Sequence, residues 1–149
     1  MKILRMTNQD KAFYSIMGPF LARREIEKEI GYPIYDDDGK VWFIALKGKE
    51  VIGFCYIAEK KKQHYQLGSY YVIKGNRHKG VFRILFNNAI DGVNGTIALT
   101  TKNDYVKEFL AEEGFTVTQA RGGFTEYSKE YGANETVRES GLQCAGSAN

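Results

Sequence analysis

Cysteine is scarce in this chain, and its placement argues against a metal site or a disulfide framework. Only Cys55, inside an apolar run, and Cys144, inside a polar segment, occur among the 149 residues. Zinc sites and disulfide scaffolds need more cysteines at regular spacings. The acidic run Asp36–Asp38 is not followed by further ligands at the spacing of a calcium-binding loop. We therefore expect no metal.

Long apolar runs are also missing. No stretch approaches the roughly 18 apolar residues that a membrane-spanning helix needs, and the first residues lack the apolar core of a signal peptide. The net charge is only +3, whereas nucleic-acid-binding domains usually concentrate much more positive charge on one face. These absences predict a cytoplasmic protein without a membrane partner. Nucleic acid stays open as a partner but is not indicated.

The residues that are present suit one domain. Hydrophobic residues make up 43% of the chain, enough to fill a single core at this length. Beyond Tyr131, only Val137 and Leu142 are larger apolar side chains, too few to build a core. We expect a domain over residues 1–130 and a flexible polar C-terminal tail over residues 131–149.

The apolar periodicity predicts the order β, α, α, β, β, β, α, β, α, β, β. Helices are expected over residues 13–21 and 22–30, with a kink or break at Gly18-Pro19, and over residues 80–93 and 105–113. Gly114 is expected to end the last helix in a left-handed conformation, with Phe115 contacting Leu110. Strands are expected over residues 2–6, 41–46, 51–58, 65–73, 96–101, 115–120 and 124–128. Hairpins combined with one strand–helix–strand crossover predict an α/β (α+β) fold with a mixed sheet.

The segment from Lys74 to Arg83 carries the clearest functional signal. A strand runs into a basic turn, and a helix opens at Gly80, where no side chain keeps a ligand from the backbone. The first turn of a helix has unpaired N–H groups and a positive dipole end, so it favours an anion such as a pyrophosphate. It is not a Walker loop. The basic residues around it are Lys74, Arg77, His78, Lys79 and Arg83.

This segment resembles motif A of the GCN5-related N-acetyltransferase (GNAT) superfamily, whose loop has the pattern [QR]-x-x-G-x-[GA]. The chain has Arg77-x-x-Gly80-x-Phe82, with the expected apolar residue, Val72, five positions before the arginine. Phe82 departs from the small residue of the family. The hairpin over residues 46–54 and the segment Asn103–Phe115 resemble the family's second and third strands and its motif B. The resemblance extends over roughly residues 1–130.

The resemblance implies a mostly antiparallel sheet of about six to seven strands, flanked by about four helices and splayed between strands four and five. It implies acetyl-CoA as the acyl donor, with the pantetheine arm bonded to the backbone around Val72 and Lys74. A small-molecule or macromolecular amine would enter over the N-terminal helices, and a homodimer is compatible with the family. The implied cofactor-binding residues are Val72, Lys74, Arg77, His78, Lys79, Gly80, Val81, Phe82, Arg83 and Asn103.

The catalytic groups of the family are not all present. The position of its usual glutamate base is Gln66, and the position of its usual tyrosine acid is Leu110. His64 lies on the same face of the strand as Gln66, and histidine is a residue type that commonly serves as a general base, so it is the candidate base. Tyr70, Tyr71 or solvent would protonate the leaving thiolate. Besides an N-acetyltransferase, a catalytically degenerate binding or structural protein, or a member acting on nucleic acid or modified nucleobases, stays open.

Overall fold

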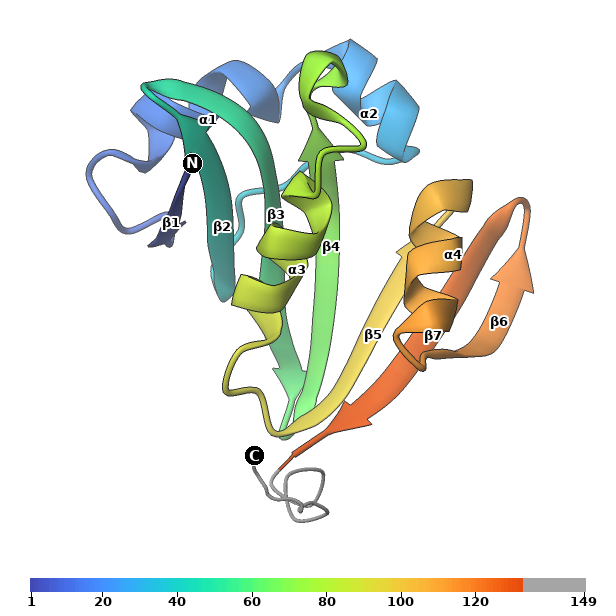
Figure 1. Cartoon of the computed structure of the whole chain (residues 1–149). Coiled ribbons are helices and arrows are strands. Elements are labelled where there is room, and N and C mark those ends of the chain that lie inside the picture. Colours follow the sequence, from blue (N-terminus) through green and yellow to red (C-terminus); the bar gives the residue numbers. More distant parts are fainter. Residues whose placement is uncertain (133–149) are drawn as a thin grey trace.

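The computed structural model describes residues 1–132, and these form one seven-stranded sheet with the order β1-β2-β3-β4-β5-β7-β6 (Figure 1). Every neighbouring pair is antiparallel except β4 and β5, which are parallel. The strands are β1 (Lys2–Met6), β2 (Lys40–Lys47), β3 (Glu50–Lys61), β4 (His64–Val72), β5 (Gly95–Thr101), β6 (Thr116–Arg121) and β7 (Phe124–Tyr131). The predicted mixed, mostly antiparallel sheet is confirmed.

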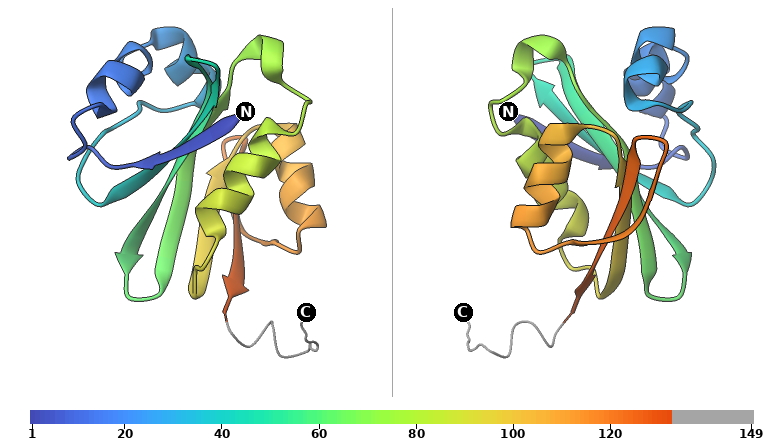
Figure 2. Two further views of the ribbon diagram at one scale, coloured as in Figure 1. Left: turned by 60° about the vertical axis from the view of Figure 1, so that its left-hand side comes forward. Right: turned by 90° about the vertical axis from the view of Figure 1, so that its right-hand side faces the viewer.

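Helices cover both faces of the sheet. The described residues contain α1 (Phe13–Leu21), α2 (Arg24–Ile30), α3 (Val81–Ile90) and α4 (Asp104–Glu112), with a short 3-10 turn, η1 (Lys74–Asn76). Helices α1 and α2 lie on one face, and α3 and α4 lie on the other (Figure 2). Within residues 1–132, no helix is long and apolar enough to span a membrane.

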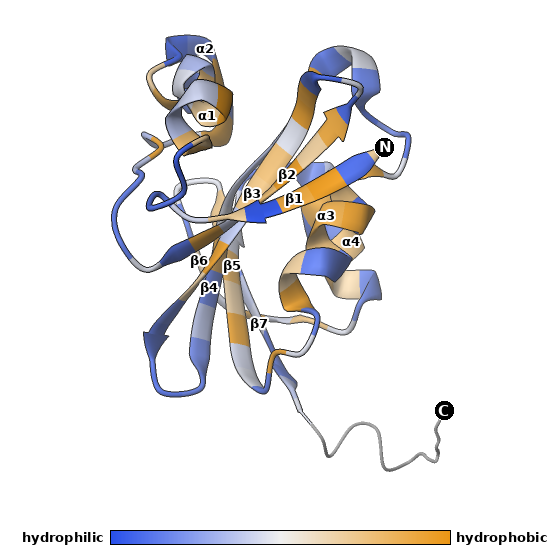
Figure 3. Cartoon of the chain, turned by 90° about the vertical axis from the view of Figure 1, so that its left-hand side faces the viewer, coloured by the Kyte–Doolittle hydropathy of each residue, from blue (hydrophilic) through white to orange (hydrophobic). Residues whose placement is uncertain are grey.

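The two faces hold two separate cores because side chains alternate along the central strands. In β3, Phe54 and Tyr56 face α1 and α2, whereas Cys55 and Ile57 face α3. In Figure 3, hydrophobic residues recur along the strands and on the helices of both faces. This double burial explains why β3 is a nearly continuous apolar run in the sequence.

The sheet opens between β4 and β5. These strands pair only where His64–Gln66 meets Thr96–Ala98, at one end, and then diverge (Figure 1). Beyond the paired end, β4 contains a bulge. Its register with β3 shifts opposite Phe54 to Tyr56, and Ser69 in this part of β4 has a positive φ of 46°. The predicted splay between strands four and five is therefore present.

Some predicted boundaries were wrong. Helix α1 runs through Gly18-Pro19, and the break falls at Ala22-Arg23 instead. Pro19 is tolerated because Ser15, whose carbonyl loses its helical partner, is exposed. Strand β3 continues to Lys61 and β7 to Tyr131, since each keeps pairing with its neighbour. Residues 133–149 of the predicted tail lie outside the described residues.

Candidate functional site

A cleft occupies the opening between β4 and β5. Its walls come from the end of β4, the loop that leads to α3, the last turn of α2 and the start of α4. Because the strands no longer pair here, backbone and side chains that would be buried in a continuous sheet are accessible to a ligand. The lining residues are Glu29, Ile30, Tyr70, Tyr71, Val72, Asn76, Arg77, His78, Gly80, Val81, Phe82, Thr101, Lys102, Asn103, Tyr105 and Val106.

The loop at the top of the cleft ends in an open helix N-terminus. Gly80 is the N-cap of α3 with a φ of +83°, and no side chain caps the helix. A Cβ at Gly80 would have no heavy atom within 4 Å, so the space above the first turn is free. His78 is also left-handed, with a φ of +62°. This is the geometry that the basic segment predicted for an anion site.

The side chain of Arg77 is held by an ion pair and a hydrogen bond. Its Nη2 lies 2.6 Å from the Oε2 of Glu29 in α2, and its Nε donates to the Val72 carbonyl at 2.6 Å. The guanidinium also lies 5.3 Å from the ring of Tyr71. Arg77 thus fastens the loop to α2, and it occupies the Val72 carbonyl, which belongs to the backbone around which the resemblance places the pantetheine arm.

The other basic side chains of the loop differ in their partners. Arg83 lies 3.4 Å from a carboxylate oxygen of Glu113 and stacks over Phe109. Lys74 and Lys79 are exposed and form no ion pair with a carboxylate of residues 1–132. The positive charge left for a ligand therefore comes from these two lysines together with the helix terminus.

Phe82, the departure from motif A, points into the core. Its ring is 6% exposed and packs edge-on against Tyr70 at 5.5 Å and Phe109 at 5.1 Å. The bulky residue therefore fills the space between α3, α4 and β4 and does not cover the first turn of α3. The departure leaves the first turn of α3 uncovered.

The tyrosines at the end of β4 lie on opposite faces. Tyr70 is buried on the α3 side. Burial raises the pKa of Tyr70, so its hydroxyl stays protonated near neutral pH. Tyr71 is half-buried on the α1 side against Phe54. Both line the cleft, and their role as proton donors stays a prediction.

The structure does not bring His64 to the cleft. His64 begins β4 at the end where β4 and β5 still pair, opposite Lys61 and Thr96, and its side chain is exposed. Of the predicted residues, those that line the cleft are Tyr70, Tyr71, Val72, Arg77, His78, Gly80, Val81, Phe82 and Asn103. Lys74, Lys79 and Arg83 lie beside it on the loop and on α3.

Several lining residues were not predicted. Glu29 reaches the cleft from α2, and Lys102 and Tyr105 reach it from the junction of β5 and α4. Asn103 is the N-cap of α4 and accepts a hydrogen bond from the Val106 N–H at 3.0 Å, which orients that junction. The Asn103 cap is recognisable in the sequence and marks the start of the helix that carries Tyr105. The sequence around Glu29 contains no comparable motif.

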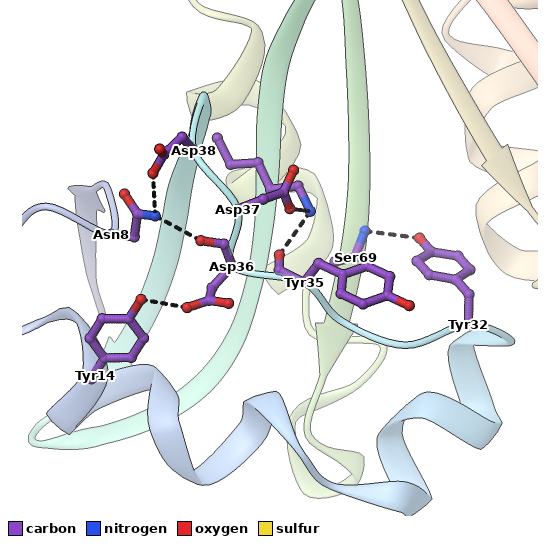
Figure 4. Close-up of polar contacts among 9 residues, drawn as sticks. Asn8, Tyr14, Tyr32, Tyr35, Asp36, Asp37, Asp38 and Ser69 are labelled. Atoms are coloured by element: carbon purple, nitrogen blue, oxygen red, sulfur yellow. Dashed lines mark hydrogen bonds and ion pairs between the residues drawn. The ribbon is translucent and has the colours of Figure 1, made fainter.

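The acidic loop Asp36–Asp38 is satisfied internally (Figure 4). The Asp36 carboxylate accepts from the Tyr14 hydroxyl, and Asp38 accepts from Asn8. Asp37 pairs at 2.9 Å with the buried Lys40, whose ammonium also donates to the Tyr35 carbonyl. No cluster of potential metal ligands occurs within residues 1–132.

Comparison with known proteins supports the same fold. The Escherichia coli ElaA structure has a TM-score of 0.68 at 13% identity and covers 87% of this chain and 100% of its own. A GNAT-family acetyltransferase from Streptococcus pneumoniae has a TM-score of 0.67 at 16% identity, covering 87% and 100%. An aminoglycoside 6′-N-acetyltransferase complexed with coenzyme A has a TM-score of 0.67 at 15% identity, covering 87% and 97%.

A comparison with curated proteins finds no match. The model of the acetyltransferase (GNAT) family, by contrast, matches residues 5–115, which is more than half of the chain and includes the splayed strands and the basic loop before α3. The chain belongs to the acetyltransferase (GNAT) family.

Proposed function

We propose that the chain transfers the acetyl group of acetyl-CoA to a primary amine by direct attack. The observation that carries this proposal is the cleft at the splay of β4 and β5, which leads to the uncapped first turn of α3. Membership of the acetyltransferase family supports acyl transfer in general. The choice of donor and acceptor is the proposed part.

The residues of the loop fit an acyl-CoA donor. The first N–H groups of α3, the bare backbone at Gly80 and the exposed Lys74 and Lys79 would hold a pyrophosphate. The backbone of β4 that no longer pairs with β5 would hold the amide groups of the pantetheine arm. Arg77 would have to release the Val72 carbonyl if the arm uses that atom.

Direct attack requires a neutral amine, and the leaving sulfur must gain a proton. The amine nitrogen forms a bond to the acetyl carbon, the carbon–sulfur bond breaks, and one amine proton leaves to a base. Glu29 is the carboxylate that lines the cleft, so it replaces His64 as the candidate proton acceptor. Tyr70 and Tyr71 are the hydroxyl donors on the β4 wall.

The first test is binding of acetyl-CoA by calorimetry, because it does not require the acceptor to be known. Micromolar affinity, about −8 kcal/mol, is expected for the natural chain. The double variant Lys74→Ala, Lys79→Ala is expected to bind at least about tenfold more weakly, because two charge-assisted contacts are lost. The matched control removes Lys60 and Lys62 from the β3–β4 hairpin, at the opposite end of β4. Equal loss in both double variants would refute the assigned site.

A catalytically degenerate, CoA-binding member is the second candidate. The observation that favours it is the position of the family's acid, because Leu110 and its neighbour Phe109 are both buried in the core and neither can donate a proton. Release of free thiol from acetyl-CoA in the presence of a panel of amines separates the two. Binding without thiol release toward any amine would favour the degenerate member.

A further inference from the structure

A second hollow lies on the other side of the last turn of α2 from the cleft. Residues of this turn line both spaces: Glu29 and Ile30 line the cleft, and Glu27 and Lys28 line the hollow. Lys102 lines both, so the two spaces meet at its side chain. The hollow, called the α2 hollow below, is lined by Arg24, Glu27, Lys28, Gly31, Tyr32, Pro33 and Lys102.

The α2 hollow has an excess of positive charge without internal partners. Arg24, Lys28 and Lys102 face a single lining carboxylate, Glu27. None of these three cations forms an ion pair with a carboxylate of residues 1–132. The other two carboxylates of α2 are already used, since Glu25 pairs with Arg23 and Glu29 pairs with Arg77.

Lys102 is held at the hollow by packing. Gly31 ends α2 in a left-handed conformation, with a φ of +100°, and a Cβ there would lie 2.5 Å from the ring of Phe124 and 3.2 Å from the Lys102 side chain. Only glycine leaves room for both side chains against the end of α2. The Lys102 ammonium lies 5.8 Å from the centre of the Phe124 ring. These contacts place the Lys102 side chain beside the end of α2.

The other lysines of this region differ from Lys102. The ammonium of Lys107 donates to the Gly123 carbonyl at 3.1 Å, and that of Lys129 donates to the Glu113 carbonyl at 2.6 Å. Those two cations stabilise the packing of α4 against the β6–β7 hairpin. The charges of Arg24, Lys28 and Lys102 have no such structural use in the described part of the chain.

We propose that the acceptor is a small amine that also carries an anionic group, a carboxylate or a phosphate, and that the α2 hollow binds this anionic group. The proposal rests on the proposed function. The amine end would point through the junction at Lys102 into the cleft, toward Glu29, while the anionic end stays with Arg24, Lys28 and Lys102. A polycationic amine would be repelled by the positive charges of Arg24, Lys28 and Lys102.

The alternative source of attraction for a cationic acceptor, the acidic loop, is not available. Its three carboxylates are engaged by Tyr14, Lys40 and Asn8 (Figure 4). None of them lines the cleft or the α2 hollow. For an acceptor that reaches the cleft past Lys102, the nearest charges are therefore those of the α2 hollow.

The test compares amines that differ only in the anionic group. With acetyl-CoA in excess, kcat/KM is measured for 4-aminobutyrate against its amide, for phosphoethanolamine against ethanolamine, and for 1,4-diaminobutane. The kcat/KM of each anionic amine is expected to exceed that of its partner without the anionic group by about tenfold, and the diamine should have the lowest kcat/KM. The ratio within each pair should shrink at high salt. The larger ratio of the two pairs tells carboxylate from phosphate.

Variants locate the effect in the hollow. Lys28→Ala is expected to raise KM for the anionic amines about fivefold, since its side chain is exposed, and to leave KM for the amines without an anionic group unchanged. Lys102→Ala is expected to raise the KM of each anionic amine about fivefold relative to that of its partner without an anionic group. Lys102→Arg should restore most of the effect. The matched control, Lys62→Ala, removes an exposed lysine from the β3–β4 turn and should change nothing.

Failure of this inference can be told from failure of the proposed function. Turnover of neutral amines or the diamine equal to that of the anionic amines would overturn the inference and leave acyl transfer intact. If no amine is acetylated, acyl transfer fails, and binding of 4-aminobutyrate and phosphoethanolamine by calorimetry then decides the inference. Binding that Lys102→Ala weakens would support an anion site, and no binding of either compound would overturn it.

Discussion

The basic loop, residues 74–83, and the acidic loop, residues 36–38, are both dense runs of one charge sign. They differ in how far their charged side chains have partners within the fold. In the acidic loop every carboxylate has a partner on another segment, Tyr14, Lys40 or Asn8. In the basic loop, Lys74 and Lys79 keep their charge exposed and lie next to the uncapped N-terminus of α3.

The difference suggests a rule for such runs: charged side chains that are engaged by other parts of the fold contribute to packing, and those without partners are available to a ligand. The same difference exists within the basic loop, where Arg77 is paired with Glu29 but Lys74 and Lys79 form no ion pair within residues 1–132. The acidic loop instead joins the start of β2 to α1 and to the segment before it, and so contributes to stability. Substitutions in the basic loop should therefore change ligand affinity, and substitutions in the acidic loop should change stability.

The largest expected effect is at Gly80. Gly80→Ala is expected to weaken acetyl-CoA binding about a hundredfold, or ~2.7 kcal/mol, because a methyl group would stand where the ligand must approach the backbone. Gly92→Ala is the matched control, since Gly92 is also left-handed, with a φ of +76° and no atom within 4 Å of a Cβ. Both variants should lose similar stability in urea. Equal affinity in the two would contradict the anion site.

A smaller effect is expected in the acidic loop. Asp37→Ala should lower the free energy of unfolding by about 1 kcal/mol, because Lys40, 7% exposed, loses its carboxylate while the Asp37 end of the pair is open to solvent. Binding of acetyl-CoA should not change. The single tryptophan, Trp42, is fully buried near Lys40 and reports unfolding by fluorescence. Asp38→Ala, which breaks only an exposed hydrogen bond, is the control.

The same pair predicts a pH dependence. The hydrogen bond from Lys40 holds the pKa of Asp37 below its ordinary value of 3.8. A lowered pKa in the folded state means that the stabilisation is present above about pH 4 and is lost as the pH falls through the folded pKa. The natural chain should thus lose more stability than Asp37→Ala on acidification from pH 6 to about pH 3. Parallel curves for the two proteins would show that the pair contributes nothing.

The smallest effect is expected when a paired charge of the basic loop is released. Glu29→Gln should strengthen acetyl-CoA binding about threefold, because the charge of Arg77 then adds to that of Lys74 and Lys79. Glu25→Gln, on the same helix and paired with Arg23, is the control without an expected effect. Weaker binding in Glu29→Gln would mean that the Arg77 link holds the loop in its binding conformation.

Local features of the sequence predicted much of this structure. The ending of α4 has the expected left-handed Gly114, and the Phe115 N–H donates to the Leu110 carbonyl at 2.9 Å. Asn103 caps the same helix. Gly80 opens α3 as expected. All of these depend on residues within a few positions of one another, so the pattern contains the information.

The wrong or missing assignments involve segments far apart in the chain. The sequence put His64 in the correct strand, but only the pairing of β4 with β5 at that end shows that it lies away from the cleft. Glu29 and Lys102 reach the cleft from segments with no motif. The partners of Arg77 and of the acidic loop likewise depend on how α2 and α1 dock.

By itself, the sequence determined the order of helices and strands, the ending of α4 and the glycine that opens α3, because periodicity, capping and glycine conformation are local. Tertiary structure alone decided where the sheet parts, which charges are neutralised and which side chains meet at the cleft and the α2 hollow. These outcomes depend on pairing across tens of residues, where hydrogen bonds between strands and the docking of helices select one arrangement among many that the local pattern permits.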